Sequence, residues 1–112
     1  MVYALTLDRI GDALVDAHKR GIDVKVILDR YNSEEGSEYN KLLQAGVPVK
    51  LHQGPGLMHN KVAVIDDSVV ITGSYNWTGS AENENDENLL VIRSANISNT
   101  YEKEFDRIWD TS

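Results

Sequence analysis

Short runs rich in β-branched residues alternate with segments of helical periodicity, and this alternation constrains the fold more than any other feature of the chain. Residues 2–5 form a short apolar run, and residues 22–28 form a second one that ends at Asp29. Between them, apolar residues recur at the spacing of one helix face: Ile10, Ala13, Leu14 and Ala17. Thr6 or Asp8 is expected to cap this helix and Gly21 to follow its end. The pattern predicts a βαβ unit, with parallel strands and a helix packed on the sheet.

The rest of the chain extends this sheet. A polar loop over residues 32–37, a helix over 37–45 and a strand over 47–51, with Pro48 near its start, make a second βαβ unit. The second half is predicted to hold a hairpin of two strands with its turn at Asp67-Ser68, a long polar loop, a strand and a C-terminal helix: residues 59–66, 69–74, 78–86, 88–93, and about a dozen residues starting near Ser98 or Asn99. We therefore predict one domain over residues 1–112, an α/β fold with a mixed sheet flanked by helices.

Composition excludes several classes of protein. The 112 residues include no cysteine, which rules out disulfides, thiolate catalysis and cysteine-based zinc sites. No apolar run reaches the roughly 18 residues needed to span a bilayer, and the first residues show no secretory signal. We expect a soluble protein, with a cytoplasmic location favoured. The net charge of −7 argues against a large duplex-binding surface but allows a small cationic pocket for one phosphate.

Four polar residues are predicted to converge beside the hairpin. Residues two apart in a strand project to the same face, so His59 and Lys61 pair on one segment and Ser74 and Asn76 on the other. An imidazole, an ammonium, a hydroxyl and an amide together suit a tetrahedral phosphate, with His59 as a nucleophile and the other three as donors to its oxygens. No second histidine or carboxylate pair is near enough in sequence to predict a metal site.

Two acidic residues accompany this group. A nucleophilic imidazole needs an acceptor on its other nitrogen, and Glu87, at the end of the polar loop, is the candidate. Asp66 has the opposite strand parity from His59 and is expected to point away from the pocket. The alternatives are that Ser74 and Asn76 satisfy a turn and that Glu87 belongs to a solvated acidic loop.

The spacing of these residues resembles the HKD motif of the phospholipase D superfamily, as found in small endonuclease-type members that carry a single motif. The pattern is His-x-Lys-x4-Asp followed by Gly-Ser-x-Asn: His59, Lys61, Asp66, Gly73, Ser74 and Asn76. On average residue usage the first half alone would arise by chance in roughly one such chain in a hundred, and the full pattern far more rarely. Glu87-Asn88 before an apolar run also resembles the family's acidic partner for the histidine.

The resemblance implies a phospholipase D-like fold and a metal-independent phosphodiesterase that needs no cofactor and works through a phosphohistidine. In the family two motifs meet at a shared site, so one motif implies a homodimer that places His59 of each subunit there. It also implies that Lys61, Ser74 and Asn76 bind phosphate, and that Asp66 and Gly73 are structural. Small relatives usually have another strand and helix before the position of Val2, which this chain is expected to lack.

The motif leaves the substrate open. A nuclease acting on DNA or RNA is favoured, because single-motif dimeric relatives often have this activity. A phospholipase acting on a phospholipid such as cardiolipin is the alternative, although no clear membrane-binding face is visible in the sequence. A non-catalytic interaction domain or inactive fragment is the alternative from another class.

Overall fold

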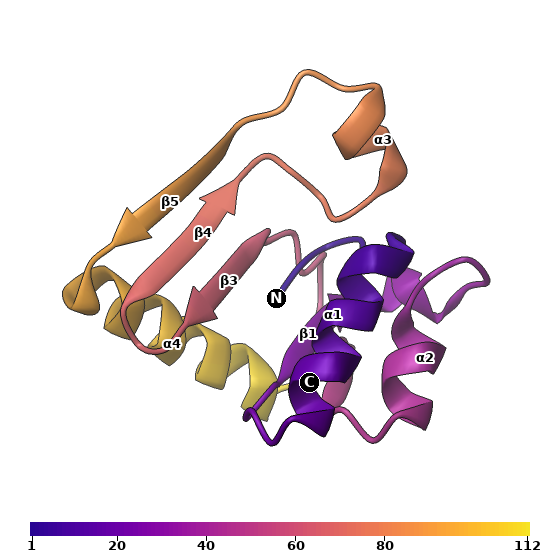
Figure 1. The fold of residues 1–112 in the computed structure, drawn as a ribbon, viewed down its shortest axis with the longest axis horizontal. Coiled ribbons are helices and arrows are strands. Elements are labelled where there is room, and N and C mark those ends of the chain that lie inside the picture. The colour runs from indigo at the N-terminus through magenta and orange to yellow at the C-terminus, as the bar shows by residue number, and fades with distance from the viewer.

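The computed structural model describes residues 1–112, which fold into helices and strands that alternate through the first half of the chain (Figure 1). Five strands, four α-helices and one 3-10 helix follow one another in this order: α1 (Asp8–Lys19), β1 (Val26–Asp29), η1 (Arg30–Ser33), α2 (Tyr39–Gln44), β2 (Val49–His52), β3 (Val62–Ile65), β4 (Val69–Gly73), α3 (Gly79–Asn83), β5 (Leu89–Arg93) and α4 (Ala95–Asp110). None of the helices combines the length and the apolar character needed to cross a membrane.

The strands form two sheets that the N-terminal residues join. β1 and β2 pair in parallel, whereas β3, β4 and β5 form an antiparallel sheet with β4 in the middle. Between the two sheets, Val2 bridges to Leu28 in parallel and to Lys61 in antiparallel orientation. The amide of Val62 also donates to the carbonyl of Met1 at 2.8 Å. The order is therefore β2, β1, N-terminal segment, β3, β4, β5, which confirms the predicted α/β fold with a mixed sheet.

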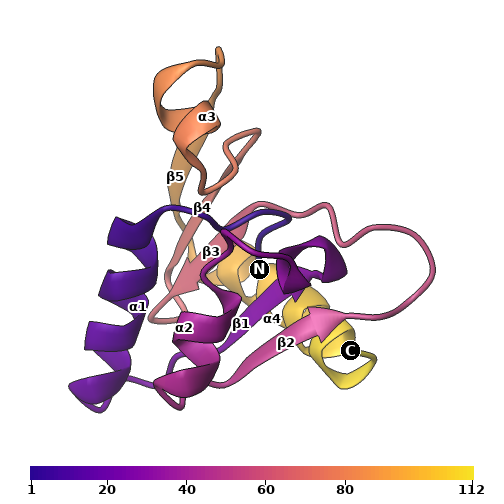
Figure 2. The ribbon, with the colours of Figure 1, turned by 90° about the vertical axis from the view of Figure 1, so that its right-hand side faces the viewer.

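Helices lie on both sides of this sheet (Figure 2). On one side α1 and α2 cover β1, where Leu5, Leu28 and Leu42 are fully buried in one apolar cluster. On the other side α4 packs under β3 and β4, where Ile27 and Val70 are fully buried in a second cluster with α4 side chains around them. Alternate residues of β1 thus feed opposite cores, as expected for a strand buried on both faces.

The antiparallel sheet is covered by a helix on one face only. Ile92 of β5 packs against the cluster under α4. Leu89 and Val91 lie at alternate positions of the same strand and therefore project to the opposite face of the sheet. Leu89 and Val91 are 51 % and 57 % exposed, and Ile65 of β3 is 45 % exposed. The polar ends of these strands, rather than this apolar face, carry the site described below.

In the first half of the chain, three predicted boundaries were wrong. Residues 2–5 form isolated bridges instead of a strand, because the Ala4 amide bonds to a side chain rather than to a neighbouring strand. The next strand begins at Val26, not at residue 22, since the Ile22 amide still closes the end of α1 on Ala17. The N-cap of α1 is Leu7, which has no side-chain capping bond, so neither Thr6 nor Asp8 has that role.

In the second half, four further predictions need correction. The strand predicted over 59–66 covers only Val62–Ile65, so His59 lies in the segment before it. The turn of the hairpin contains three residues, Asp66, Asp67 and Ser68, instead of the predicted Asp67 and Ser68, and both aspartates have positive φ. The polar loop contains the short helix α3, capped by the Thr78 hydroxyl. The last helix begins at Ala95, because the Ser94 side chain caps it by accepting a hydrogen bond from an amide in its first turn.

Candidate active site

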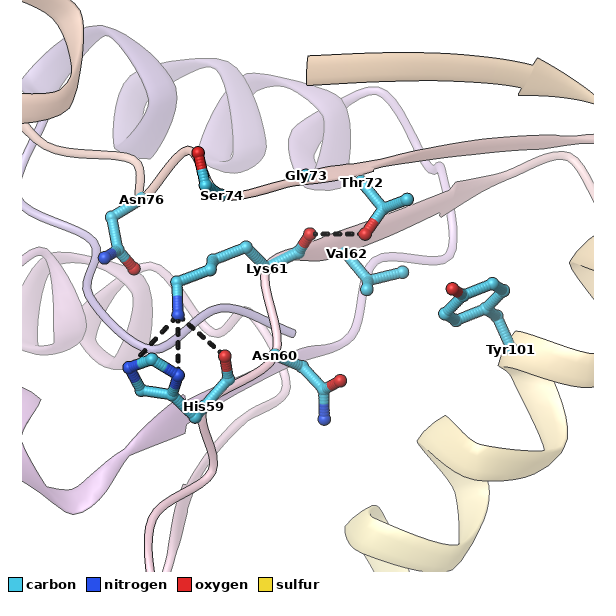
Figure 3. Close-up of a pocket in the computed structure, with 9 residues that line it drawn as sticks. All are labelled: His59, Asn60, Lys61, Val62, Thr72, Gly73, Ser74, Asn76 and Tyr101. Carbon is cyan, nitrogen blue, oxygen red and sulfur yellow. Dashed lines mark hydrogen bonds between the residues drawn. The ribbon is translucent and has the colours of Figure 1, made fainter. Parts of the chain in front are cut away.

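An open pocket of about 500 Å³ lies where β3 begins and β4 ends. Figure 3 labels the nine residues that line it, and most are polar: His59, Asn60, Lys61, Val62, Thr72, Gly73, Ser74, Asn76 and Tyr101. The four residues predicted to converge therefore do line one pocket. His59 and Lys61 come from the segment that enters β3, and Ser74 and Asn76 from the segment that leaves β4. The hairpin register brings the two segments together, because Val62 pairs with Thr72.

The ammonium of Lys61 lies against the imidazole of His59 (Figure 3). Its Nζ is 3.1 Å from Nδ1 and 3.3 Å from Nε2 of that ring, and it donates to the His59 carbonyl at 2.7 Å. A neutral imidazole has one acceptor nitrogen, so Lys61 donates to whichever ring nitrogen carries no proton. In this state Lys61 occupies the acceptor nitrogen of a neutral His59 ring, so the cation and the imidazole lone pair lie next to each other.

The pKa of Lys61 is lowered from its ordinary value. The main cause is burial, which disfavours the charged form, and the carboxylate of Glu87 acts in the opposite direction. Glu87 does not line the pocket, but its negative charge acts on the Lys61 ammonium. An incoming phosphate diester would bring a second negative charge to Lys61 and favour the ammonium further.

Glu87 bonds to Ser74 and not to His59 within one chain. Its Oε1 accepts from the Ser74 hydroxyl at 2.7 Å, and the Ser74 hydroxyl in turn accepts from the amide of Asn88 at 3.1 Å. This pair of bonds connects the start of β5 to the end of β4. The predicted contact between Glu87 and His59 is thus not made in the single chain, and the orienting role of Glu87 stays a prediction.

Asn76 is held so that its amide nitrogen is left free. Its Oδ1 accepts from the backbone amide of Ala4 at 3.2 Å, which assigns the other end of the side chain, the NH2 group, as the donor for a ligand. On the other side of this segment, the Tyr75 hydroxyl donates to Glu82 of α3 at 2.5 Å. Asn76 is thereby fixed between the N-terminal segment and the loop that carries α3.

Of the two residues predicted to be structural, Gly73 lines the pocket at the end of β4 and Asp66 lies away from it. At Gly73 an added Cβ would be 2.2 Å from the carbonyl oxygen of Asn88, so only glycine permits the close approach of β4 to β5 at that point. Asp66 lies in the hairpin turn at the far end of β3 from His59 and does not line the pocket. This position agrees with the predicted direction of Asp66, although the reason is the turn rather than strand parity.

A buried carboxylate fixes the backbone just before His59, and the sequence reading missed it. Asp29, at the end of β1, is 1 % exposed and accepts from the amide of Met58 at 2.8 Å through Oδ2. Its Oδ1 accepts from the amide of Tyr31 at 3.0 Å. The place of Asp29 at the carboxyl end of a parallel strand is the one sequence signal that pointed to this role.

An aromatic ring also borders His59. The ring of Tyr3 lies 4.8 Å from the His59 ring, centroid to centroid, at an interplanar angle of 55°, and Lys61 Nζ is 5.5 Å from the Tyr3 centroid. The backbone of Tyr3 is held on both sides: its amide donates to Asn60, and its carbonyl accepts from the side chain of Asn32 at 2.6 Å. The sequence predicts a strand over residues 2–5 and gives no signal that Tyr3 belongs to the site.

No group of three histidine, cysteine, aspartate or glutamate side chains gathers anywhere in residues 1–112 in a way that could hold a metal ion. The polar side chains that line the pocket are one imidazole, one ammonium, two amides and three hydroxyls, and none of them is a carboxylate that could serve as an anionic metal ligand. This donor set can bind a phosphate diester through its non-bridging oxygens and bring phosphorus to the imidazole.

Sequence comparisons place the chain among proteins of one family. A family model described as "Cardiolipin synthase, PLD-like domain" matches residues 1–109. A mitochondrial cardiolipin hydrolase from Xenopus laevis is 41 % identical over 110 residues, which cover 97 % of this chain and 52 % of that protein. A phospholipase D from Rickettsia bellii is 41 % identical over 100 residues, covering 88 % of this chain and 50 % of its own length. The chain therefore spans about half the length of the curated relatives it matches.

Comparison with solved structures agrees. A crystal structure of a phospholipase D family member, Nuc from Salmonella typhimurium, superposes with a TM-score of 0.94 at 34 % sequence identity, covering 99 % of this chain and 76 % of that one. NucT from Helicobacter pylori gives a TM-score of 0.85 at 27 % identity, with coverages of 98 % and 76 %. Both likenesses extend over nearly all of the described fold, including the strands that position the pocket.

Proposed function

Because this chain belongs to the phospholipase D superfamily, we propose that it is a metal-independent phosphodiesterase in which His59 attacks phosphorus. The observation that carries the proposal is the contact between His59 and Lys61 in a polar pocket of about 500 Å³. A nucleophile and a cation for the phosphate oxygens are thus already side by side. The amide nitrogen of Asn76 supplies a further donor from the opposite wall.

The first step follows from these positions. A phosphate diester entering the pocket takes Lys61 as a partner for a non-bridging oxygen, which releases the lone pair of the imidazole. That nitrogen forms an N–P bond while the bond from phosphorus to the leaving oxygen breaks, which gives a phosphohistidine. Water then attacks phosphorus, the N–P bond breaks and His59 is regenerated. Lys61 and Asn76 lower both barriers if they hold the oxygens on which charge builds up.

We propose that a second imidazole protonates the leaving oxygen and that a homodimer supplies this imidazole. His18 and His52 lie outside the pocket, so the chain itself brings only His59 to the site. A two-fold axis through the pocket would place a second His59 opposite the first. That second imidazole would protonate the leaving group and then take a proton from the attacking water. Glu87 does not contact His59 of its own chain. In the dimer it could instead orient the imidazole of the partner subunit.

We favour nucleic acid over phospholipid as the substrate. The pocket lining is mostly polar, and the exposed Tyr31 stacks on the ring that borders His59, which suits a nucleotide better than an acyl chain. The second candidate is a phospholipid, which the names of the cardiolipin hydrolase and phospholipase D relatives favour. Cleavage of a single-stranded oligonucleotide without release of phosphatidic acid from cardiolipin-containing vesicles would support the first candidate, and the reverse pattern the second.

The proposed chemistry is tested by the hydrolysis of bis-p-nitrophenyl phosphate in EDTA. We expect turnover by the wild type that is lost in His59→Ala and kept in His18→Ala, a matched control at the end of α1. Size-exclusion chromatography with light scattering on the same samples tests the dimer. Turnover that requires an added divalent cation, or that persists in His59→Ala, would overturn the proposal.

A further inference from the structure

Tyr31 forms a stack with the tyrosine that touches His59. The rings of Tyr3 and Tyr31 lie 6.0 Å apart, centroid to centroid, at an interplanar angle of 12°, so they are nearly parallel and offset. Tyr3 is in turn 4.8 Å from the His59 ring. The series of rings therefore runs outward from the nucleophile to Tyr31, which is 54 % exposed.

The backbone of Tyr31 is held by buried polar side chains. Its amide bonds to the buried carboxylate of Asp29, and the next residue, Asn32, is 2 % exposed. Asn32 bonds through its side chain to the carbonyl of Tyr3 and to the amide of Leu5. The same buried asparagine therefore ties the backbone of Tyr3 to the segment that carries Tyr31, which keeps the two residues side by side near His59.

An exposed aromatic face beside a phosphodiester site suits a nucleic acid as the substrate. Every nucleobase has a π-face, and single-stranded nucleic acids are bound largely by stacking of bases on aromatic side chains. The headgroup region of a phospholipid offers no such face. Stacking is also suited to this chain because its net charge of −7 limits the affinity that it can gain by neutralising phosphates.

We infer that Tyr31, backed by Tyr3, is a stacking subsite for the base of a nucleotide next to the scissile phosphate, and that the substrate is single-stranded nucleic acid. This inference rests on the proposed nuclease function. A base in a duplex is already stacked and paired, so its face is not available to Tyr31 without unpairing. The subsite therefore favours single strands and discriminates little between base identities, because stacking does not read the hydrogen-bonding edge.

The test combines a change in the protein with a change in the substrate. The substrates are a single-stranded oligodeoxynucleotide with one preferred cleavage site, the same oligonucleotide with one abasic position scanned along it, and methyl p-nitrophenyl phosphate, which carries no base. The proteins are wild type, Tyr31→Ala, Tyr31→Phe and a control, Ile22→Ala, whose side chain is 48 % exposed before β1. The measured quantity is kcat/KM in EDTA.

We expect Tyr31→Ala to lower kcat/KM on the intact oligonucleotide about tenfold, in the range found for lost base stacking. Tyr31→Phe and Ile22→Ala should stay near wild type, and all four proteins should hydrolyse the small diester equally. At one position next to the cleaved bond, an abasic site should cost the wild type about tenfold and Tyr31→Ala nothing further.

Two results would overturn the stacking subsite without overturning the proposed nuclease function. Tyr31→Ala that cleaves the oligonucleotide at the wild-type rate would remove the subsite but leave the nuclease. The same conclusion would follow if, at every position, an abasic site lowered kcat/KM of Tyr31→Ala by the same factor as it lowers kcat/KM of the wild type. A wild type that hydrolyses the small diester but no oligonucleotide would overturn the nuclease proposal and the subsite together.

Discussion

The buried carboxylate of Asp29 is predicted to hold the nucleophile in place, and its isosteric replacement Asp29→Asn tests this directly. In the wild type both carboxylate oxygens accept backbone amides, from Met58 at 2.8 Å and from Tyr31 at 3.0 Å. An asparagine keeps one acceptor oxygen and turns an NH2 group toward the other amide. One of the two backbone donors therefore loses its acceptor in a position that is 1 % exposed.

The expected cost follows from these two bonds. A hydrogen bond to a charged acceptor contributes about 1.5–3 kcal/mol, and a buried donor left without an acceptor costs about 1–3 kcal/mol. We therefore expect Asp29→Asn to lower the free energy of unfolding by about 2 kcal/mol and Asp29→Ala, which removes both acceptors, by about 4 kcal/mol. Against a total of about 5–15 kcal/mol for a domain, both effects are large. The loss of the Met58 bond should also displace His59, and a shift of about 1 Å can reduce kcat about a hundredfold.

The assay is urea unfolding followed by tryptophan fluorescence, together with kcat for a small diester under native conditions. The matched control is Asp23→Asn, since Asp23 is exposed and its carboxylate makes no hydrogen bond or ion pair. Asp23→Asn should change the free energy of unfolding by less than about 0.5 kcal/mol. An Asp29→Asn protein with wild-type stability and wild-type kcat would refute the claim that this carboxylate positions His59.

Three further predictions concern the pocket and its supports. Burial lowers the pKa of Lys61, so binding of the diester, which needs the ammonium, should weaken as pH rises through a pKa below the usual lysine range. Lys61→Arg should move the rise in KM to higher pH, and an unchanged pH dependence of KM would contradict the assignment. Gly73→Ala brings a Cβ to 2.2 Å from the Asn88 carbonyl oxygen and should lower stability by about 1–3 kcal/mol in a urea titration, whereas a neutral effect would mean that β5 can move away. Ser94→Ala removes the hydroxyl that accepts from the Ile97 amide at 3.2 Å and should lower the thermal midpoint by the equivalent of about 1 kcal/mol without changing kcat.

The elements that the sequence predicted well are those whose signals are local. The period of α1, the apolar runs of β1 and β4 and the glycines after the helices all depend on neighbouring residues, and each element is found near its predicted place. The pocket was also predictable, because a hairpin register of a few residues is enough to bring His59 and Asn76 together.

The features that were missed depend on residues far apart in the chain. Nothing in the sequence near residues 2–5 indicates that Val2 pairs with two different strands, or that Tyr3 meets an imidazole 56 positions later. Asn32 reads as an ordinary loop residue, yet its side chain is buried between β1 and the N-terminal segment. The partner of Glu87 was predicted from a chemical need of His59, whereas the structure satisfies that carboxylate with Ser74 in the same chain.

Detection of a covalent phosphoryl group on His59 would test whether this residue is the nucleophile. Wild-type protein mixed with a diester in EDTA would be quenched in alkali during turnover, digested and analysed by mass spectrometry, with His59→Ala as the reference. We expect a phosphorylated peptide that contains His59 and disappears as the substrate is exhausted. Turnover in EDTA with no such adduct under conditions that trap the intermediate, or an adduct on another residue, would contradict this assignment.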